Sequence, residues 1–494
     1  MTTPKEILIN NMEKFAHIVG GEYRKSNLFV TRASVDKDLT ADPDTNYNFI
    51  SLIRPDQQPS GPYSGISIKV NPGEKHYRLS LDIGSEGFGD DYQLVATPGI
   101  RRKFVELQSR IHQYSENNEK NISCFCALNF TDDSSKPELK KMETEYADDH
   151  LDSHPMDLFA VFVDKPTLRE TSTNENEDFW KIYKFMIAIY AELRNWPSNK
   201  SQRKHVRLFE TVLPDDTADA KSELSAVKQL LEDRRYVVLQ GAPGTGKTFL
   251  TSKIASEYQK NVVFTQFHAE TSYSDFVGGY QPIEIDGHLS YKYQEGPLIK
   301  AIRMALAAKD RPTLLIVDEI NRANLSNVLG ESFYLFETTG IIDRPRIQLG
   351  ESDGTSHEPL YLKHLPYNLR VVATMNTADR SLAVIDFALR RRFAWYTMMP
   401  IELSDKDLED NGSFHKEEFE RIQSIFEMYA TSDEMLMQPG QAYFITKAGQ
   451  SFSSRVKYEL LPLIREYLDN GFLSSAADQF NEFFVDEINE PIYL

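Results

Sequence analysis

A glycine-rich octapeptide constrains the fold of this chain more than any other feature. The sequence GAPGTGKT, residues 241–248, follows the short apolar stretch YVVLQ and opens a segment with helical spacing of apolar residues. Glycines in such a loop let backbone N–H groups turn inward around phosphates at the positive end of a helix. A loop of this kind between a strand and a helix predicts an α/β domain that binds the phosphates of a nucleotide.

The pattern also assigns roles to the residues of the loop. Lys247 is expected to reach the β- and γ-phosphates, and the Thr248 hydroxyl is expected to ligate Mg²⁺. The other residues expected to form the phosphate-binding loop are Gly241, Pro243, Gly244, Thr245 and Gly246. The loop therefore predicts a nucleoside triphosphatase that uses Mg²⁺.

Two more apolar stretches end in polar residues after the loop. TLLIVDE ends in Asp318, expected in the Mg²⁺ shell, and Glu319, placed to polarise an attacking water. An Asp-Glu pair after a strand is also a common helix cap, but its position downstream of a phosphate loop favours the functional interpretation. LRVVATMN ends in Asn376, which would lie beside these acids if both strands belong to one parallel sheet.

Three consecutive arginines, residues 390–392, follow in DFALRRRFAW. A solvated basic turn explains at least one of them. The alternative for one or two of them is an arginine finger that reaches the γ-phosphate held by a neighbouring subunit. A site completed in this way is competent only in an oligomer, so the interpretation predicts ring assembly.

The chain is too long for a single core, because cores stop growing at roughly 250–300 residues. Residues 1–200 alternate strand and helix patterns, including a predicted hairpin at 66–83, and predict a separate α+β domain. Basic and then acidic residues with a proline fill 201–219, which indicates a linker. We place the nucleotide-binding core at 220–400 and a further subdomain at 401–494.

Composition excludes several classes of protein. A net charge of −19 argues against non-specific coating of nucleic acid, so any DNA contact requires a local basic patch. Cys124 and Cys126 are expected to be small core residues of a protein in a reducing compartment. No window approaches the roughly 18 apolar residues of a membrane span, and the N-terminus lacks a leader pattern. We therefore expect a cytoplasmic protein with no membrane partner.

Four motifs in order, GAPGTGKT, DEINRAN, MNTADRS and ALRRRF, resemble the AAA+ motor of McrB, the GTP-dependent subunit of McrBC-type restriction systems. FHAETSYSDFVGGYQP and QPGQAYF are similar to two further segments of that family, although Gln441 and Ala442 stand where the family has His and Ser. The resemblance covers about residues 220–470 and not the N-terminal domain. It implies that the α/β AAA+ core is followed by a helical lid at 401–494.

The resemblance also implies roles for individual residues. Asn321, Asn376 and Asp379 would orient the attacking water or sense the γ-phosphate, and Arg391 and Arg392 would be the fingers. It implies a hexameric ring, Mg²⁺ with GTP in preference to ATP, and modified DNA bound by the N-terminal domain. Cutting would fall to a McrC-like nuclease subunit, since no nuclease pattern is evident in this chain. Arg455 matches a sensor of the lid only loosely. Independently of the resemblance, the acidic, glycine-containing stretch ESDGTSHEP indicates the tip of a hairpin at 345–362, with a solvated loop as the alternative.

Two alternatives remain open at this stage. An ATP-driven remodeller similar to MoxR-type AAA+ chaperones would use the N-terminal domain to grip protein. A module that senses a small ligand would use the ring only to assemble. MNTADRS favours the restriction motor, while the choice of GTP over ATP depends on the resemblance alone.

Overall fold

The computed structural model divides into two compact units, which are described separately. Unit 1 comprises Met1–Asp219, Arg421–Ser432 and Leu473–Phe480, and unit 2 comprises Ala220–Glu420, Asp433–Phe472 and Asn481–Leu494. The residues that the structure describes are 2–21, 29–40, 49–57, 62–120, 122–126, 144, 146, 157–168, 177–213, 223–285, 288–337, 345–352, 358–378, 387–404, 408 and 412–493.

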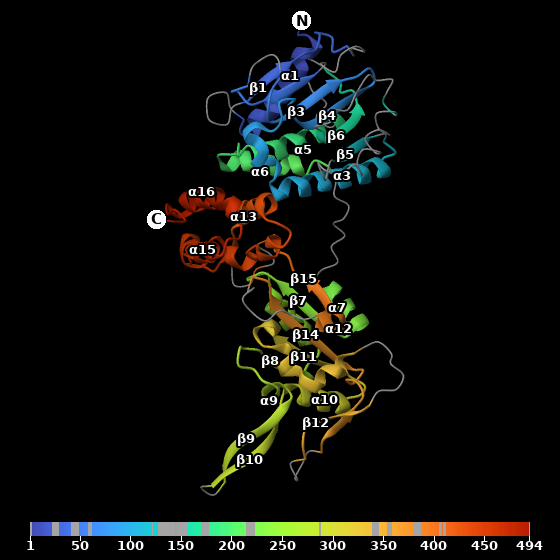
Figure 1. The fold of residues 1–494 in the computed structure, drawn as a ribbon, viewed down its shortest axis with the longest axis vertical. Coiled ribbons are helices and arrows are strands. Elements are labelled where there is room, and N and C mark those ends of the chain that lie inside the picture. Colours follow the sequence, from blue (N-terminus) through green and yellow to red (C-terminus); the bar gives the residue numbers. More distant parts are fainter. Residues whose placement is uncertain are drawn as a thin grey trace. The chain divides into compact units, whose positions relative to one another are not determined.

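Unit 1 is built on a six-stranded sheet in the order β1-β2-β3-β4-β6-β5, with every neighbouring pair antiparallel (Figure 1). The predicted hairpin is confirmed, since β3 pairs with β4 from Ile66↔Ile83 to Pro72↔Tyr77. The strands are β1 (Val30–Ala33), β2 (Ile50–Ile53), β3 (Ile66–Pro72), β4 (His76–Ile83), β5 (Ser123–Cys126) and β6 (Asp157–Asp164).

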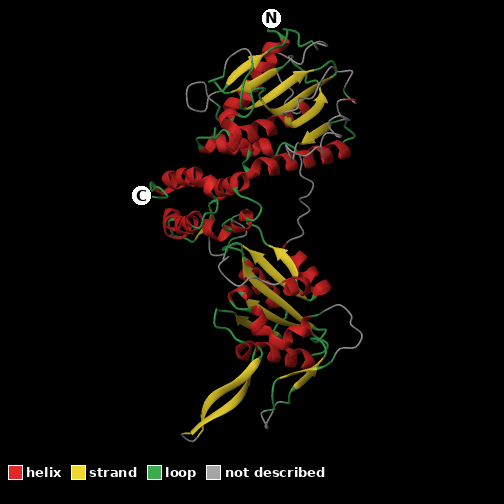
Figure 2. Cartoon of the chain, viewed as in Figure 1, coloured by secondary structure: helices red, strands yellow, loops and turns green. Residues whose placement is uncertain are grey.

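Helices pack on one face of this sheet (Figure 2). Alternate residues of β3 and β4, such as Ile68 and Leu81, belong to the same core as helix α5, which is buried on nearly all sides. Cys124 and Cys126 lie in the same core, as predicted, and burial raises the pKa of the Cys126 thiol to about 11. The helices are α1 (Pro4–Ile18), α2 (Tyr92–Val95), α3 (Pro98–Asn117), α5 (Asp178–Leu193) and α6 (Lys200–Glu210).

Helix α6 occupies residues that the sequence assigns to a linker. Asn199 caps its first turn by accepting a hydrogen bond from the Gln202 N–H, and Val206 and Phe209 are buried in the core of unit 1. The stretch is rich in basic residues and therefore resembles a linker, but its few apolar residues lie on one side of a helix. Residues 200–210 are thus helical in unit 1.

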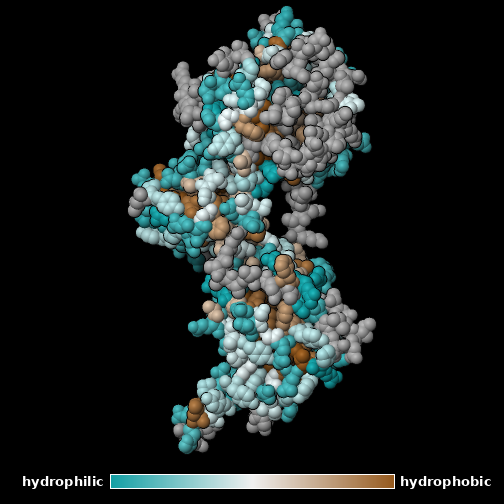
Figure 3. Space-filling model, in the orientation of Figure 1, coloured by the Kyte–Doolittle hydropathy of each residue, from teal (hydrophilic) through white to brown (hydrophobic). Residues whose placement is uncertain are grey.

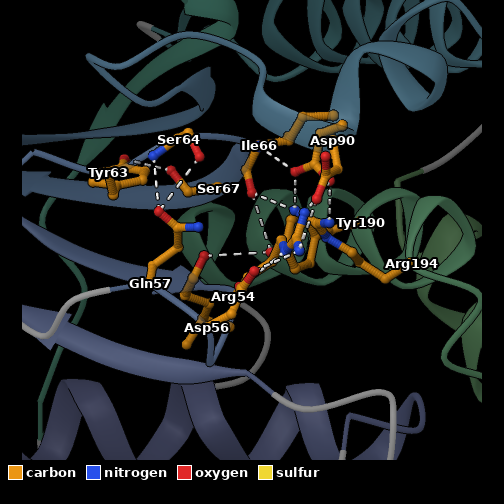
Figure 4. Close-up of polar contacts among 12 residues, drawn as sticks. Arg54, Asp56, Gln57, Tyr63, Ser64, Ile66, Ser67, Asp90, Tyr190 and Arg194 are labelled. Carbon is orange, nitrogen blue, oxygen red and sulfur yellow. Dashed lines mark hydrogen bonds and ion pairs between the residues drawn. The ribbon is translucent and has the colours of Figure 1, made fainter.

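The opposite sides of β3 and β4 carry polar side chains that are buried. Ser67 donates to Asp82 at 2.6 Å, and Lys69 Nζ donates to the same carboxylate at 3.1 Å. Tyr63 OH lies 2.7 Å from the Ser67 hydroxyl (Figure 4), and Lys69 Nζ lies 4.9 Å from the centre of the Phe49 ring. Pairing of this kind is what allows charged groups to be buried.

A second polar network fixes the start of β3 to the end of α5. Arg194 binds both carboxylate oxygens of Asp91, at 2.8 and 2.7 Å, and the Ile66 N–H donates to the same carboxylate at 2.7 Å. Burial alone would raise the pKa of Asp91, but these bonds lower it below its ordinary value. Gly65 has φ +91°, and a Cβ there would lie 2.4 Å from Asp91 Oδ2, so glycine is required at this position.

A third network surrounds Lys103 of α3, whose side chain is 6% exposed. Its Nζ lies 2.5 Å from Glu210, 3.3 Å from Glu427 and 3.8 Å from Glu192. Glu427 belongs to the part of α13 (Lys416–Tyr429) that is counted with unit 1. Because burial and the neighbouring carboxylates outweigh the attraction of Lys103, the pKa of Glu192 rises from 4.5 to about 8.

Unit 2 is built on a five-stranded sheet in the order β15-β7-β14-β11-β8, in which every neighbouring pair is parallel. The predicted parallel sheet is therefore confirmed, and the strands that end in Asp318 and Asn376 are direct neighbours. The strands are β7 (Tyr236–Gly241), β8 (Val262–Gln266), β11 (Thr313–Asp318), β14 (Leu369–Asn376) and β15 (Ala394–Thr397).

Helices cover both faces of this sheet, which gives three layers. Along β7, Val237 and Leu239 pack with α7 and α8, while Tyr236 and Val238 point into the opposite core, which α10 shares. This alternation explains why the strand has a continuous apolar sequence. The helices and helical turns of the core are α7 (Glu223–Arg234), α8 (Lys247–Glu257), α9 (Tyr273–Phe276), α10 (Pro297–Ala307), η5 (Ile320–Arg322), α11 (Leu325–Leu329), η6 (Gly330–Phe336) and α12 (Phe387–Arg392).

Two antiparallel hairpins are inserted in the core of unit 2. β9 (Gly278–Ile285) pairs with β10 (His288–Glu295), and exposed apolar side chains of this hairpin are visible in Figure 3. β12 (Ile347–Leu349) pairs with β13 (Leu360–Leu362), which confirms the hairpin predicted at 345–362, although 353–357 lie outside the described residues. Among the described helices, none has the length and apolar character of a membrane span.

The C-terminal segment is mostly helical and contributes to both units. Besides α13, its elements are β16 (Ser413–Phe414), η8 (Glu434–Met437), η9 (Gln441–Phe444), β17 (Ile445–Thr446), α14 (Phe452–Arg455), η10 (Val456–Leu460), α15 (Leu461–Asp469), η11 (Ser474–Ala476) and α16 (Ala477–Ile488).

The raised pKa of Glu192 predicts how the stability of unit 1 depends on pH. Between pH 4.5 and about 8, Glu192 is protonated in the folded chain and ionised in the unfolded chain, so the free energy of unfolding falls as pH rises through this window. Glu192→Gln removes the ionisable group and therefore this loss of stability. Its free energy of unfolding should exceed that of the parent by at least about 1 kcal/mol at pH 8.5, and by much less at pH 5.

Denaturant unfolding at the two pH values measures this difference. Glu116→Gln, an exposed change on α3, serves as the control and should be neutral at both. A gain for Glu192→Gln that is the same at pH 5 and pH 8.5 would contradict the prediction.

Candidate nucleotide-binding site

The phosphate loop connects the end of β7 to the start of α8. Gly244 and Gly246 have φ values of +79° and +88°, which only glycine adopts readily, and α8 begins at the next residue, Lys247. Lys247 Nζ donates to the carbonyl oxygens of Gly241 and Ala242, each at 2.8 Å. The ammonium group is therefore held at the loop, where incoming phosphates would exchange with these carbonyls.

Asp318 and Glu319 follow the adjacent end of β11, and one hydroxyl orients both of them. Thr374 Oγ1 donates to Asp318 Oδ1 at 2.5 Å and accepts from the Glu319 N–H at 3.0 Å. Gln266 Nε2 lies 3.4 Å from the other oxygen of Asp318. Glu319 has φ +56°, an uncommon conformation for a residue with a side chain, which turns the chain sharply at this position.

The carboxylate of Glu319 pairs with a neighbouring residue. Arg322 Nε lies 3.3 Å from Glu319 Oε2, and these side chains are 47% and 24% exposed. An ion pair this exposed contributes little to stability and is readily exchanged. Glu319 therefore retains the ability to accept a hydrogen bond from a water.

Asn321 and Asn376 meet at the same edge of the sheet. Asn321 Nδ2 donates to the Asn376 carbonyl oxygen at 3.2 Å, and Asn376 Oδ1 accepts from the Ala378 N–H at 3.1 Å. Within the described part of the chain, Asn321 Oδ1 is buried and has no hydrogen-bond partner. Asp379, the third predicted polar group, lies outside the described residues.

The three arginines differ in their surroundings. The side chain of Arg391 is 66% exposed and lies 3.3 Å from Glu337. Arg392 is 10% exposed, lies 3.2 Å from the same carboxylate, and stacks over the ring of Phe333 at 4.0 Å. Arg390 packs over Trp395. Of the two predicted fingers, Arg391 is the more accessible, and Arg392 is held within its own chain.

Arg455 ends α14 in the C-terminal segment. It donates to the Ile445 carbonyl oxygen and pairs with Glu459 at 2.7 Å. His268 is exposed, and its backbone N–H donates to the Thr271 hydroxyl at 2.9 Å. These contacts assign local structural functions to both residues.

Sequence reasoning missed three side chains at the site, namely Thr374, Gln266 and Gln441. Thr374 lies two residues before Asn376 on β14, so the period of a strand would have placed it on the same side. Gln266 ends the strand on the other side of β11. Gln441 Nε2 donates to the Thr245 carbonyl oxygen of the phosphate loop at 3.1 Å.

The residues present fit a nucleotide bound with Mg²⁺. Thr248 lies in the first turn of α8 and Asp318 ends β11, so a hydroxyl and a carboxylate supply the oxygen ligands that Mg²⁺ prefers. Asn321 Oδ1, buried and without a hydrogen-bond partner among the described residues, supplies a further acceptor at the same edge. We therefore describe this edge as a candidate site for a nucleotide with its metal.

Comparison with known proteins supports this description. A family model described as an AAA domain of the dynein-related subfamily matches residues 236–393. The chain is 34% identical over 185 residues to the Type IV methyl-directed restriction enzyme EcoKMcrB subunit of Escherichia coli (strain K12), which covers 36% of this chain and 39% of that protein. The predicted AAA+ fold of the nucleotide-binding core is confirmed.

Two further relatives are similar to this chain at lower identity. The Type II restriction enzyme BsuMI component YdiS of Bacillus subtilis (strain 168) is 30% identical over 196 residues, which cover 33% of this chain and 56% of that protein. Midasin of Giardia intestinalis is 26% identical over 108 residues, 22% of this chain and 2% of that protein. The chain thus spans 39% and 56% of the two restriction-enzyme relatives.

The bridging hydroxyl of Thr374 yields a specific prediction. Thr374→Val keeps the shape of the side chain but removes the bonds that orient Asp318 and Glu319. We expect kcat for nucleotide hydrolysis to fall about tenfold, because misplaced catalytic groups lose rate more than binding. Steady-state hydrolysis measures this effect.

Thr397→Val is the matched control, since Thr397 ends β15 and bonds only Gln240 among the described contacts. Its kcat should stay within about twofold of the parent, a difference of well under 1 kcal/mol. Equal losses in the two variants, or no loss in Thr374→Val, would show that the hydroxyl does not position the acids.

Proposed function

From the premise that this chain carries an AAA+ nucleotide-binding domain of the McrB type, we propose that it is the motor subunit of a restriction system. The observation that carries the proposal is the similarity of this chain to two restriction-enzyme components at 34% and 30% identity. The motor hydrolyses a nucleoside triphosphate, and the N-terminal unit recognises the target.

Each step of hydrolysis has a candidate residue in this chain. The backbone of residues 241–246 and Lys247 bind the phosphates, and Thr248 with Asp318 would hold Mg²⁺. The metal would neutralise charge on the phosphate oxygens. Glu319 accepts the proton of the attacking water, which Asn321 and Asn376 help to orient, together with Asp379. Thr374 keeps the two acids in place.

We propose GTP as the preferred substrate over ATP, on the resemblance to the McrB family alone. The polar groups described above contact phosphates and water, and none of them reads the purine base. Comparison of GTP with ATP turnover therefore tests the family assignment independently of the hydrolytic residues.

We also propose that the active form is a ring, with six subunits as in the family. Arg391 is the favoured finger, because its guanidinium is exposed and can leave Glu337, which Arg392 also pairs with, to reach a neighbour's γ-phosphate. Arg392 is assigned instead to holding Glu337 and Phe333 within its own subunit. Of the two finger candidates that the sequence offers, we therefore propose Arg391 alone.

The target of the N-terminal unit is proposed to be DNA that carries a base modification. Four aromatic residues lie near basic residues in the sequence and are candidates to stack on bases, namely Tyr47, Phe49, Tyr63 and Tyr77. Phe49, Tyr63 and Tyr77 are buried in the structure, and Tyr47 lies outside the described residues. The support comes instead from a basic groove of about 520 Å³ along α3, lined by Arg101, Arg102, Val105, Glu106, Ser109, Arg110 and Gln113.

The arginines of this groove suit different tasks. Arg102 donates to the Glu427 carbonyl oxygen at 2.6 Å, and Arg110 pairs with Glu106 at 2.6 Å. Arg101 is exposed, so its guanidinium is the one best placed to meet a phosphate. A positive charge at this groove supports the proposal, because a chain of net charge −19 needs a local basic site to bind DNA.

A separate subunit is proposed to cut the DNA, as a McrC-like nuclease partner would. The rival function is an ATP-driven remodelling of protein, in which the N-terminal unit would bind polypeptide. The two functions differ in nucleotide preference and in the response to duplex DNA, so one set of measurements separates them.

The full-length protein should bind methylated or hydroxymethylated duplex DNA more tightly than plain duplex, and more weakly as salt rises. Arg101→Ala should weaken binding to all duplexes about threefold at low salt and reduce the salt dependence, as expected for one lost phosphate contact. Fluorescence polarisation at two salt concentrations measures both effects, and GTP should be hydrolysed faster than ATP.

Lys204→Ala serves as the control, because it removes an exposed positive charge from α6 outside the groove. No binding to any duplex at low salt, together with a preference for ATP, would contradict the proposed function and favour the protein remodeller.

A further inference from the structure

The C-terminal segment contacts the phosphate loop through an unusual set of hydrogen bonds, all within unit 2. Three consecutive loop carbonyls each accept a donor from residues 440–442. The Gly440 N–H donates to the Pro243 oxygen at 2.9 Å, and the Ala442 N–H donates to the Gly244 oxygen at 3.1 Å. Gln441 Nε2 completes the set by donating to the Thr245 oxygen at 3.1 Å.

The backbone of residues 440–443 lies so close to the backbone of the phosphate loop that only glycine fits between them. A Cβ on Gly440 would lie 2.0 Å from the carbonyl carbon of Gly244 and 2.2 Å from the Thr245 nitrogen. A Cβ on Gly244 would lie 3.0 Å from the ring of Tyr443. Only glycine fits at Gly440, so residues 440–443 pack directly against the backbone that binds phosphate.

These bonds fix the direction of the loop amides. In a trans peptide the carbonyl of one residue and the N–H of the next point in opposite directions. Since the carbonyls of Pro243, Gly244 and Thr245 point toward residues 440–442, the N–H groups of residues 244–246 point the opposite way. N–H groups that converge in this way form the concave site that binds an anion.

We propose that residues 440–442 hold the phosphate loop in its binding conformation, and that Gln441 is a positioning residue for nucleotide binding. Its side chain is anchored at both ends, because Oε1 accepts from the Ile401 N–H at 3.3 Å while Nε2 holds Thr245. Gln441 is 8% exposed, so water competes poorly for either bond. The inference concerns the nucleotide site and does not depend on DNA recognition.

Gln441→Met tests this role, since methionine has a similar length and cannot donate to the Thr245 oxygen. The Kd for nucleoside diphosphates and triphosphates should rise about tenfold, equally for guanine and adenine nucleotides, because the loss concerns phosphate contacts. At saturating nucleotide, kcat should stay within about twofold of the parent. Titration with fluorescent nucleotides and steady-state kinetics supply the two readouts.

Gln441→His supplies a conservative rescue, because an imidazole N–H can donate to the same carbonyl; its Kd should return to within about threefold of the parent. Gln441→Glu keeps the acceptor for Ile401 and loses only the donor, so it should bind as weakly as Gln441→Met or more weakly. It also provides the test if the methionine variant does not fold.

Gln450→Met is the matched control, since Gln450 lies in the same segment and accepts from the Lys447 N–H in an exposed turn. It should bind nucleotide as the parent does. The proposal is overturned by an unchanged Kd in Gln441→Met, by equal weakening in Gln450→Met, or by a fall in kcat at unchanged Kd. These titrations contain no DNA, so their failure would leave the proposed restriction function intact.

Discussion

The parallel pairing of β14 with both β7 and β11 is the constraint on which the nucleotide site depends. It sets Asn376 opposite Gly241, where the phosphate loop begins, and places Thr374 beside Asp318 and Glu319. Adjacent strands lie about 4.8 Å apart, so groups at three strand ends converge within the reach of one nucleotide. Loss of this register would separate the loop from the acids even if every side chain remained.

Much of this arrangement could be predicted because it is local. A strand, a glycine loop and a helix in succession identify the position of Lys247, and apolar runs that end in acids identify Asp318 and Glu319. The contribution of Thr374 and Gln441 could not be predicted in the same way, since their partners are 56 and 196 residues distant. The adjacent residues Arg391 and Arg392 look alike in sequence and differ only in what packs around them.

The N-terminal unit shows a different limit of sequence reasoning. The alternation in β3 and β4 correctly predicts one apolar face, but it would assign Ser67, Lys69 and Asp82 to solvent. They are buried and bonded to one another instead. A buried polar face of a sheet has the same alternation and the same residue types as a solvent-exposed face, so the sequence pattern does not distinguish the two. Helix α6 was assigned to a linker for a related reason, since its many basic residues outnumber the two apolar residues that are buried, Val206 and Phe209.

In the proposed mechanism, Glu319 is the group that accepts a proton from the attacking water. Glu319→Gln retains the size of the side chain and should leave the Kd for nucleotide within about threefold of the parent, because the loop supplies the phosphate contacts. Single-turnover hydrolysis by this variant is the most direct measurement. We expect a rate at least about a hundredfold below the parent. A rate near that of the parent, with nucleotide bound, would contradict the account of this chain as a motor that uses these acids.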